Sequence, residues 1–147
     1  MAATAALPVL VLTACGESTV SITPPTPTGA AAAACTALDG ALPTTVDGVA
    51  SSATDPSSPY TAAWDGITLS CGGPAADVPD DAQLLAVEGV DWYPVALPQG
   101  GTRFATVGRV ATVTVNVPSN HAPEANALVD LSAPVASTVP KQNAKNA

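Results

Sequence analysis

The order of apolar and polar residues predicts a helix first and β-structure after it. Residues 30–42 are rich in alanine and contain no proline, and Cys35 and Leu38 lie near helical spacing, so we expect a short helix there. Apolar and polar residues alternate over positions 67–71, as they do in a strand with one buried face. Two glycines and a proline at 72–74 end this strand.

The second half of the chain carries the stronger β signals. Val113, Val115 and Val117 alternate with polar residues, so they share one face of a strand. Pro118 ends that strand because proline cannot donate a hydrogen bond to a neighbouring strand. Outside positions 67–71, strands are predicted over residues 46–53, 84–87, 89–94, 103–107 and 110–117, of which the last two form a hairpin.

A further helix is predicted near the C-terminus. Pro123 suits the first position of a helix, and Leu128 and Leu131 follow it with inward-facing spacing. Ser132 and Pro134 predict a restart of the helix as another short turn, which runs through Val139.

These elements predict an α+β fold in a small single domain over residues 34–140. An antiparallel sheet of four or five strands would carry short N- and C-terminal helices packed on one face. Residues 141–147 are expected to be a disordered tail. No second domain fits into a chain of this length once its first residues are set aside.

The first residues have a different character. Leu12-Thr13-Ala14-Cys15 closes an apolar run with the pattern that a bacterial lipoprotein signal peptidase recognises, so residues 1–14 are predicted to be a signal peptide and Cys15 the lipidated residue. Signal peptides usually open with Lys or Arg, and residues 1–14 contain neither. We therefore expect the natural start to lie upstream, or the first residues to have been lost.

Residues 15–33 are predicted to be a disordered tether. Their Thr, Pro and Ser content shows no apolar periodicity, and such a segment cannot bury enough surface to offset its ordering entropy. Its root-mean-square reach as a flexible chain is roughly 25 Å.

The cysteine count fits this organisation. If Cys15 carries lipid, Cys35 and Cys71 are left to pair as a disulfide, in a compartment where disulfides persist. The closed loop would stabilise the fold by about 4 kcal/mol on the chain-entropy model. Neither a redox C-x-x-C pair nor zinc-ligand spacing is present in the sequence.

Charge narrows the set of partners. The net charge of −8 argues against nucleic acid and against docking on an anionic membrane surface. With 11% charged residues and much Ala and Val, the core is expected to consist of small side chains, so that stability would depend on the disulfide.

Four residues are candidates for chemistry. Trp64 and Trp92 could form a ligand-stacking surface, or could be core aromatics. Arg109 could bind a carboxylate or pyrophosphate, or could pair with one of the many acids. His121, the only histidine, could share a metal with Glu124, or could be an exposed imidazole at a helix entry; no third ligand is evident. We expect no metal, no cofactor and no catalytic residue.

Several segments resemble a known family. They include Ala63-Trp64, Leu69-Ser70-Cys71-Gly72, Val90-Asp91-Trp92, Thr106-Val107-Gly108-Arg109 and Val115-Asn116-Val117-Pro118. Together they are similar to actinobacterial lipoproteins grouped as domain of unknown function 3515, over about residues 34–140. The resemblance implies a secreted, membrane-anchored location. It implies no reaction, so no catalytic residue can be transferred.

The sequence thus predicts a non-enzymatic lipoprotein on the outer face of the cytoplasmic membrane, held in the bilayer through acylated Cys15. It would act as a binding or accessory module for an unidentified envelope protein or cell-wall component. The alternative is a small-ligand or cell-wall-precursor binding protein that uses Trp64, Trp92 and Arg109. An envelope hydrolase would instead require His121 and acidic side chains to converge in a pocket.

Overall fold

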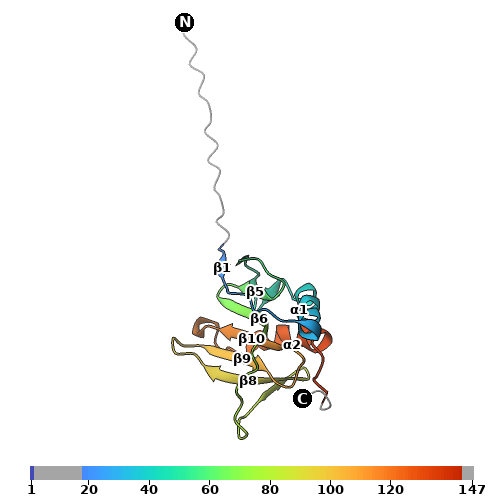
Figure 1. Cartoon of the computed structure of the whole chain (residues 1–147). Coiled ribbons are helices and arrows are strands. Elements are labelled where there is room, and N and C mark those ends of the chain that lie inside the picture. Colours follow the sequence, from blue (N-terminus) through green and yellow to red (C-terminus); the bar gives the residue numbers. More distant parts are fainter. Residues whose placement is uncertain (2–17, 144–147) are drawn as a thin grey trace.

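The computed structural model of the protein describes Met1 and residues 18–143. The predicted lipidation site Cys15 and all but Met1 of the predicted signal peptide lie outside the described residues. Figure 1 shows the elements, which are β1 (Val20–Ser21), α1 (Gly29–Ala41), β2 (Thr45–Val46), β3 (Val49–Ala50), β4 (Thr54–Asp55), β5 (Thr61–Trp64), β6 (Ile67–Gly73), β7 (Leu85–Val87), β8 (Val90–Ala96), β9 (Thr102–Thr106), β10 (Thr112–Val117), the 3₁₀ turn η1 (Ser119–His121) and α2 (Asn126–Thr138). Within the described part, no helix combines the length and apolar composition that crossing a bilayer requires.

Among residues 18–143, six strands form one antiparallel sheet in the order β5-β6-β10-β9-β8-β7. The predicted α+β class and antiparallel sheet are confirmed, with more strands than the four or five expected. One strand the pattern missed is β5, whose central residues are the two alanines Ala62 and Ala63. Alanine carries little strand preference of its own, so the pairing of β5 with β6 decides its conformation.

Three dipeptides ending in glycine reverse the chain. Asp47-Gly48, Asp65-Gly66 and Glu88-Gly89 all have positive φ at both residues, and each joins two antiparallel strands as a two-residue turn. This backbone matches the twist of a hairpin. The prediction of one strand over residues 46–53 is therefore wrong: the chain turns at Asp47-Gly48 and forms the short hairpin β2–β3.

Both helices pack on the same face of the sheet, as predicted. The buried side of α1 consists of Ala34, Cys35 and Leu38, and α1 contacts both α2 and β6. The buried side of α2 includes Leu128 and Leu131, and α2 also contacts β7 and β8. Val113, Val115 and Val117 of β10 are completely buried beneath them. The hydrophobic core thus lies between one face of the sheet and the two helices.

The predicted restart of the second helix is wrong. α2 is continuous from Asn126 to Thr138 and includes Pro134. Proline costs the helix one backbone hydrogen bond. On either side of it, Leu131 and Val135 are fully buried, so core packing holds both turns in one helix.

A disulfide joins Cys35 of α1 to Cys71 of β6, with 5.5 Å between the two Cα atoms. The predicted pairing is confirmed. It fastens the helical layer to a strand inside the sheet, and both cysteines are 1% exposed.

The predicted disordered tether is wrong from β1 onward. β1 pairs in parallel with β4, and the backbone N–H of Val20 donates to the carbonyl of Ala53 at 2.8 Å. The ring of Pro27 lies directly on the backbone of Gly72, where a Cβ would come within 2.5 Å of it. These contacts order the segment, although its composition alone would not.

The predicted disordered tail, residues 141–147, starts before the folded part of the chain has ended. The N–H of Gln142 donates to the carbonyl of Gly108 at 2.8 Å, and Arg109 and Lys141 pair as an antiparallel bridge. Residues 141–142 are therefore attached to the turn between β9 and β10. Residues 144–147 of the predicted tail lie outside the described residues.

We expect replacement of both Cys35 and Cys71 by Ala to lower the free energy of unfolding by about 4 kcal/mol, because the unfolded chain regains the entropy of an open loop. Urea denaturation of the wild type and the double variant would measure this. The double variant should no longer respond to dithiothreitol; an equal loss of stability of both proteins on reduction would contradict the assignment.

Candidate functional site

The two tryptophans belong to the core and not to a ligand surface. Trp92 is 0% exposed, and its indole N–H donates to the hydroxyl of Ser132 at 2.9 Å. Trp64 is 1% exposed, and its N–H donates to the carbonyl of Pro43 at 3.1 Å. Trp64 borders a hollow of about 550 Å³ beside the end of α1, but its indole presents no face for stacking. The hypothesis of a stacking surface is therefore wrong.

Arg109 is also held by hydrogen bonds within the fold. Its two terminal nitrogens donate to the carbonyls of Val139 at 2.6 Å and Gly89 at 2.9 Å, and its buried Nε has no hydrogen-bond partner. Burial lowers the pKa of the guanidinium, and the nearby carboxylate of Asp91 partly opposes this effect. Arg109 thus connects the residue that follows α2 to the turn before β8. The prediction that it binds a ligand is not supported by these contacts.

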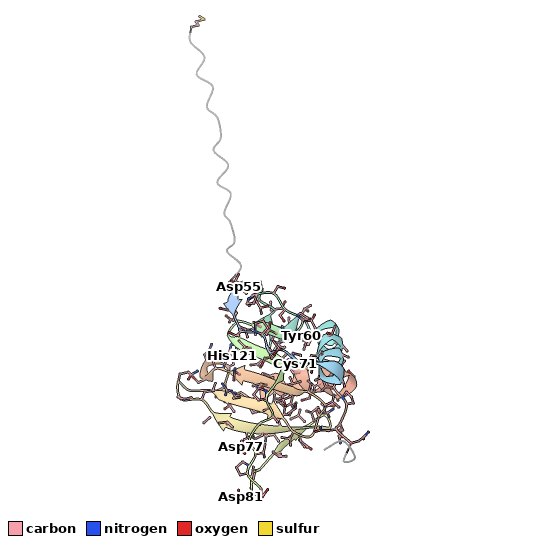
Figure 2. The ribbon with its side chains drawn as sticks, viewed as in Figure 1. Asp55, Tyr60, Cys71, Asp77, Asp81 and His121 are labelled. Carbon is pink, nitrogen blue, oxygen red and sulfur yellow. A yellow bond between two sulfur atoms is a disulfide. The ribbon has the colours of Figure 1, made fainter. Side chains whose placement is uncertain are left out.

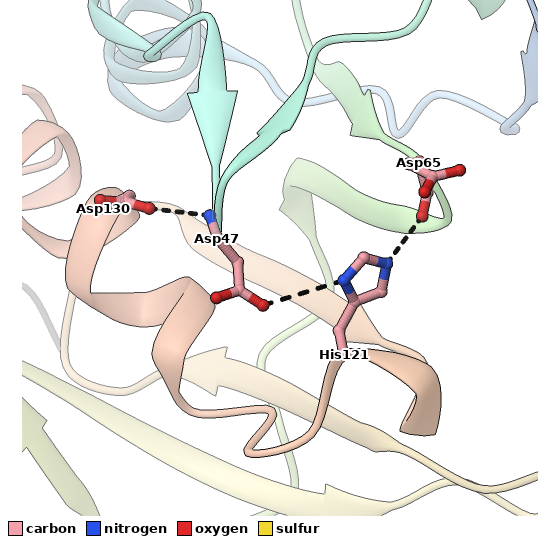
Figure 3. A network of polar contacts seen from close by, with 4 residues as sticks. All are labelled: Asp47, Asp65, His121 and Asp130. Carbon is pink, nitrogen blue, oxygen red and sulfur yellow. Dashed lines mark hydrogen bonds and ion pairs between the residues drawn. The ribbon is translucent and has the colours of Figure 1, made fainter.

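His121 takes part in a polar network shown in Figure 3. Its Nε2 lies 2.9 Å from the carbonyl oxygen of Asp65, so Nε2 is the donor because a carbonyl can only accept. Its Nδ1 lies 3.8 Å from a carboxylate oxygen of Asp47, whose N–H in turn donates to the carboxylate of Asp130 at 2.8 Å. The network joins the turns after β2 and β5 to η1 and α2.

This network is a link between elements, and its members do not form a metal site. Only 9% of the His121 side chain is exposed, so it is not the exposed imidazole that the sequence allowed. Among the described residues, no three His, Cys, Asp or Glu side chains gather as metal ligands would.

The face of the sheet turned away from the helices carries different side chains from the face that forms the core. Side chains alternate between faces along each strand, so the residues that alternate with those of the core lie on this face, Ala105 among them although it is buried. Cross-strand register places them in two rows: Ser70, Thr114, Ala105 and Tyr93 in one, and Thr68, Asn116, Arg103 and Val95 in the other. We call the eight residues of these two rows the open face.

Arg103 is held in a defined place on the open face. Its Nε–H donates to Oδ1 of Asn116 at 2.9 Å, and the amide of Asn116 approaches the hydroxyl of Thr68 at 3.4 Å. Arg103 is exposed, and no Asp or Glu of the described residues forms an ion pair with it. Its two terminal nitrogens therefore remain available to a partner.

The segment after β6 turns the open face into a groove. Residues 73–77, which end in Asp77, line a hollow of about 560 Å³ together with Ser70, Tyr93 and Arg103. This volume lies in the range of small-molecule sites. Arg103 and Asn116 also border a smaller hollow of about 250 Å³ on their other side. The arrangement offers hydroxyl groups, an aromatic ring, one cation and one carboxylate to a bound molecule.

Sequence reasoning did not identify this groove. The alternation along β6, β9 and β10 already marked which residues face away from the core. The register between β9 and β10 brings Arg103 beside Asn116. The path of residues 73–77 forms one side of the groove. The candidates that the sequence suggested, the two tryptophans and Arg109, are instead buried in the fold.

Comparison with known proteins gives one match. A family model described as "Protein of unknown function (DUF3515)" matches residues 1–144, which confirms the family, domain of unknown function 3515; the match says nothing of a lipoprotein or an actinobacterial source. No curated protein and no solved structure matches the chain.

We expect Ser132→Ala to destabilise the fold by about 1–3 kcal/mol, because the buried indole N–H of Trp92 would lose its acceptor. The matched control is Ser137→Ala on the same helix, where the hydroxyl is exposed and bonds only to the carbonyl of Pro134. Urea unfolding followed by tryptophan fluorescence measures both. Equal effects of the two substitutions would contradict a structural role for the Trp92–Ser132 bond.

Proposed function

The chain belongs to the DUF3515 family of proteins of unknown function, and from this premise we propose that it is a non-catalytic binding protein of the cell envelope. It is anchored by acylated Cys15 to the outer face of the cytoplasmic membrane and binds an envelope component on the open face of its sheet. The observation that carries the binding role is the groove of about 560 Å³ in which Arg103 is oriented but not ion-paired within the described residues.

Two features support the location. Leu12-Thr13-Ala14-Cys15 has the pattern of a lipoprotein processing site. The disulfide between Cys35 and Cys71 is of the kind that persists in oxidising compartments outside the cytoplasm. The two features are independent, because the second involves neither Cys15 nor the residues before it.

The length of chain between Cys15 and β1 supports a particular orientation. Cys15 lies five residues before Val20, and five residues span at most about 18 Å. An acylated Cys15 would therefore keep β1 and its partner β4 near the bilayer. Figure 2 shows Asp55 of β4 at one end of the domain and Asp77 and Asp81 at the other end. In this orientation Asp77, which lines the groove, lies at the end of the domain away from the membrane.

Charge is consistent with that orientation. The net charge of −8 disfavours contact between the domain and anionic headgroups. Asp77 and Asp81 lie at the end of the domain opposite Asp55 of β4 (Figure 2), so repulsion by the headgroups acts less on them when β1 and β4 are near the bilayer.

Anchoring can be tested in bacterial cells that express the protein. We expect the wild type in the membrane fraction with the intact mass of an acylated chain beginning at Cys15, and we expect Cys15→Ser to be neither acylated nor cut before residue 15. Thr13→Ala keeps a small residue at its position and should be acylated like the wild type. An unacylated wild type would refute this part of the proposal.

Use of the groove can be tested by photo-crosslinking in intact cells. Val95 lines the groove and is 43% exposed, whereas Val129 lies on α2 and is 60% exposed. A benzophenone amino acid at position 95 should crosslink to an envelope component, and the same group at position 129 should not. Equal products from both positions, or products from position 129 alone, would place the binding surface elsewhere.

A further inference from the structure

We propose that the groove binds a saccharide bearing a carboxylate, and that Arg103 is the residue that holds this carboxylate. The proposal rests on the proposed function in one respect, the use of the open face as a binding surface. It adds the chemical class of the ligand and the residue that recognises it.

Arg103 has the geometry of a prepared carboxylate site. Its Nε–H is occupied by Asn116 at 2.9 Å, which fixes the plane of the guanidinium, and Asn116 is itself in contact with Thr68. The two terminal nitrogens are left to form a pair of parallel hydrogen bonds with the two oxygens of one carboxylate. The chain has twelve acidic residues, yet within the described part none is ion-paired with Arg103.

The shape of the site favours a ligand longer than one ring. The hollows of about 560 Å³ and 250 Å³ share Arg103 and Asn116 along their common border. Gln99 and Gly100 line the smaller hollow, and Tyr93 lines the larger one. A chain of sugar units could occupy both hollows with its carboxylate at Arg103.

The floor of the groove favours a saccharide over a peptide. β6, β10 and β9 are each paired with a strand on both sides, so their backbones cannot accept a peptide as an added strand. Recognition must therefore come from side chains, and Ser70, Thr114 and Tyr93 carry hydroxyl groups that both donate and accept hydrogen bonds. The ring of Tyr93 adds an apolar surface with a polar tip.

Charge limits the ligand to few carboxylates. Among the described residues, Arg103 is the only cation lining either hollow, and Asp77 lines the larger hollow with it. A polyanion would be repelled by Asp77 and by the net charge of −8. A mostly neutral, hydroxyl-rich molecule with one carboxylate fits both the cation and its surroundings.

The test uses the full chain carrying Cys15→Ser, so that its result does not depend on acylation. N-acetylmuramic acid and N-acetylglucosamine serve as probes in titration calorimetry, because they share one ring and differ by a lactyl carboxylate. We expect the carboxylate-bearing sugar to bind at least about tenfold more tightly, as a charge-assisted hydrogen-bond pair implies. Arg103→Gln should abolish this preference.

The matched control is Lys141→Gln, which removes the same charge from an exposed residue that lines neither hollow. It should bind both sugars as the parent does. Equal affinity for the two sugars, no saturable binding of either sugar, or an unchanged preference in Arg103→Gln would overturn the proposal. The comparison of the two sugars needs no variant, so it remains decisive even where a substitution disturbs folding.

A peptide probe separates the ligand class from the proposed function. An acetylated dipeptide with a free C-terminal carboxylate should bind more weakly than N-acetylmuramic acid, and tighter binding of the dipeptide would overturn the saccharide assignment. If position 95 crosslinks in cells while neither sugar binds, the open face is a binding surface for another class of ligand. In that case only this inference fails.

Discussion

The disulfide between Cys35 and Cys71 ties α1 to β6, and much of the architecture depends on this link. α1 packs beside α2, so the covalent link to the sheet also fixes the position of the second helix. Both helices lie on one face, where small residues of α1 and the valines of β10 allow close approach. The opposite face of the same strands is left without a helical cover in the described structure, and it becomes the open face.

Large side chains with polar ends fill part of the core, and their polar groups form hydrogen bonds within the fold. The indole N–H of Trp92 reaches Ser132 across the layers, and the guanidinium of Arg109 reaches the carbonyls of Val139 and Gly89. A buried donor without an acceptor costs more than a hydrogen bond contributes, so these residues are held by their partners. In the proposed function, binding falls to less conspicuous residues, above all Arg103, whose charge is exposed and whose orientation is set by Asn116.

The ordered segment after residue 18 changes the relation between the predicted anchor and the domain. A flexible tether over residues 15–33 would let the domain rotate freely above a membrane. Because β1 is paired with β4 and Pro27 lies on Gly72, only a few residues separate Cys15 from the folded domain. A domain anchored as proposed would then have a restricted set of orientations, in which Asp77 of the groove lies at the end away from the bilayer.

The sequence by itself determined the fold class, the helix α1 and the long strands β6, β8, β9 and β10, because helical and alternating patterns are local. It also determined the pairing of Cys35 with Cys71, because the cysteine count leaves few combinations. Only the tertiary structure decided the two-residue strands β1 and β4, the continuity of α2 through Pro134 and the burial of both tryptophans. It also decided the groove, in which strand register sets Arg103 beside Asn116 and residues 73–77 form one side. The physical reason is that periodicity tells which face a side chain takes, whereas neighbours across strands depend on contacts between distant segments, which no local pattern encodes.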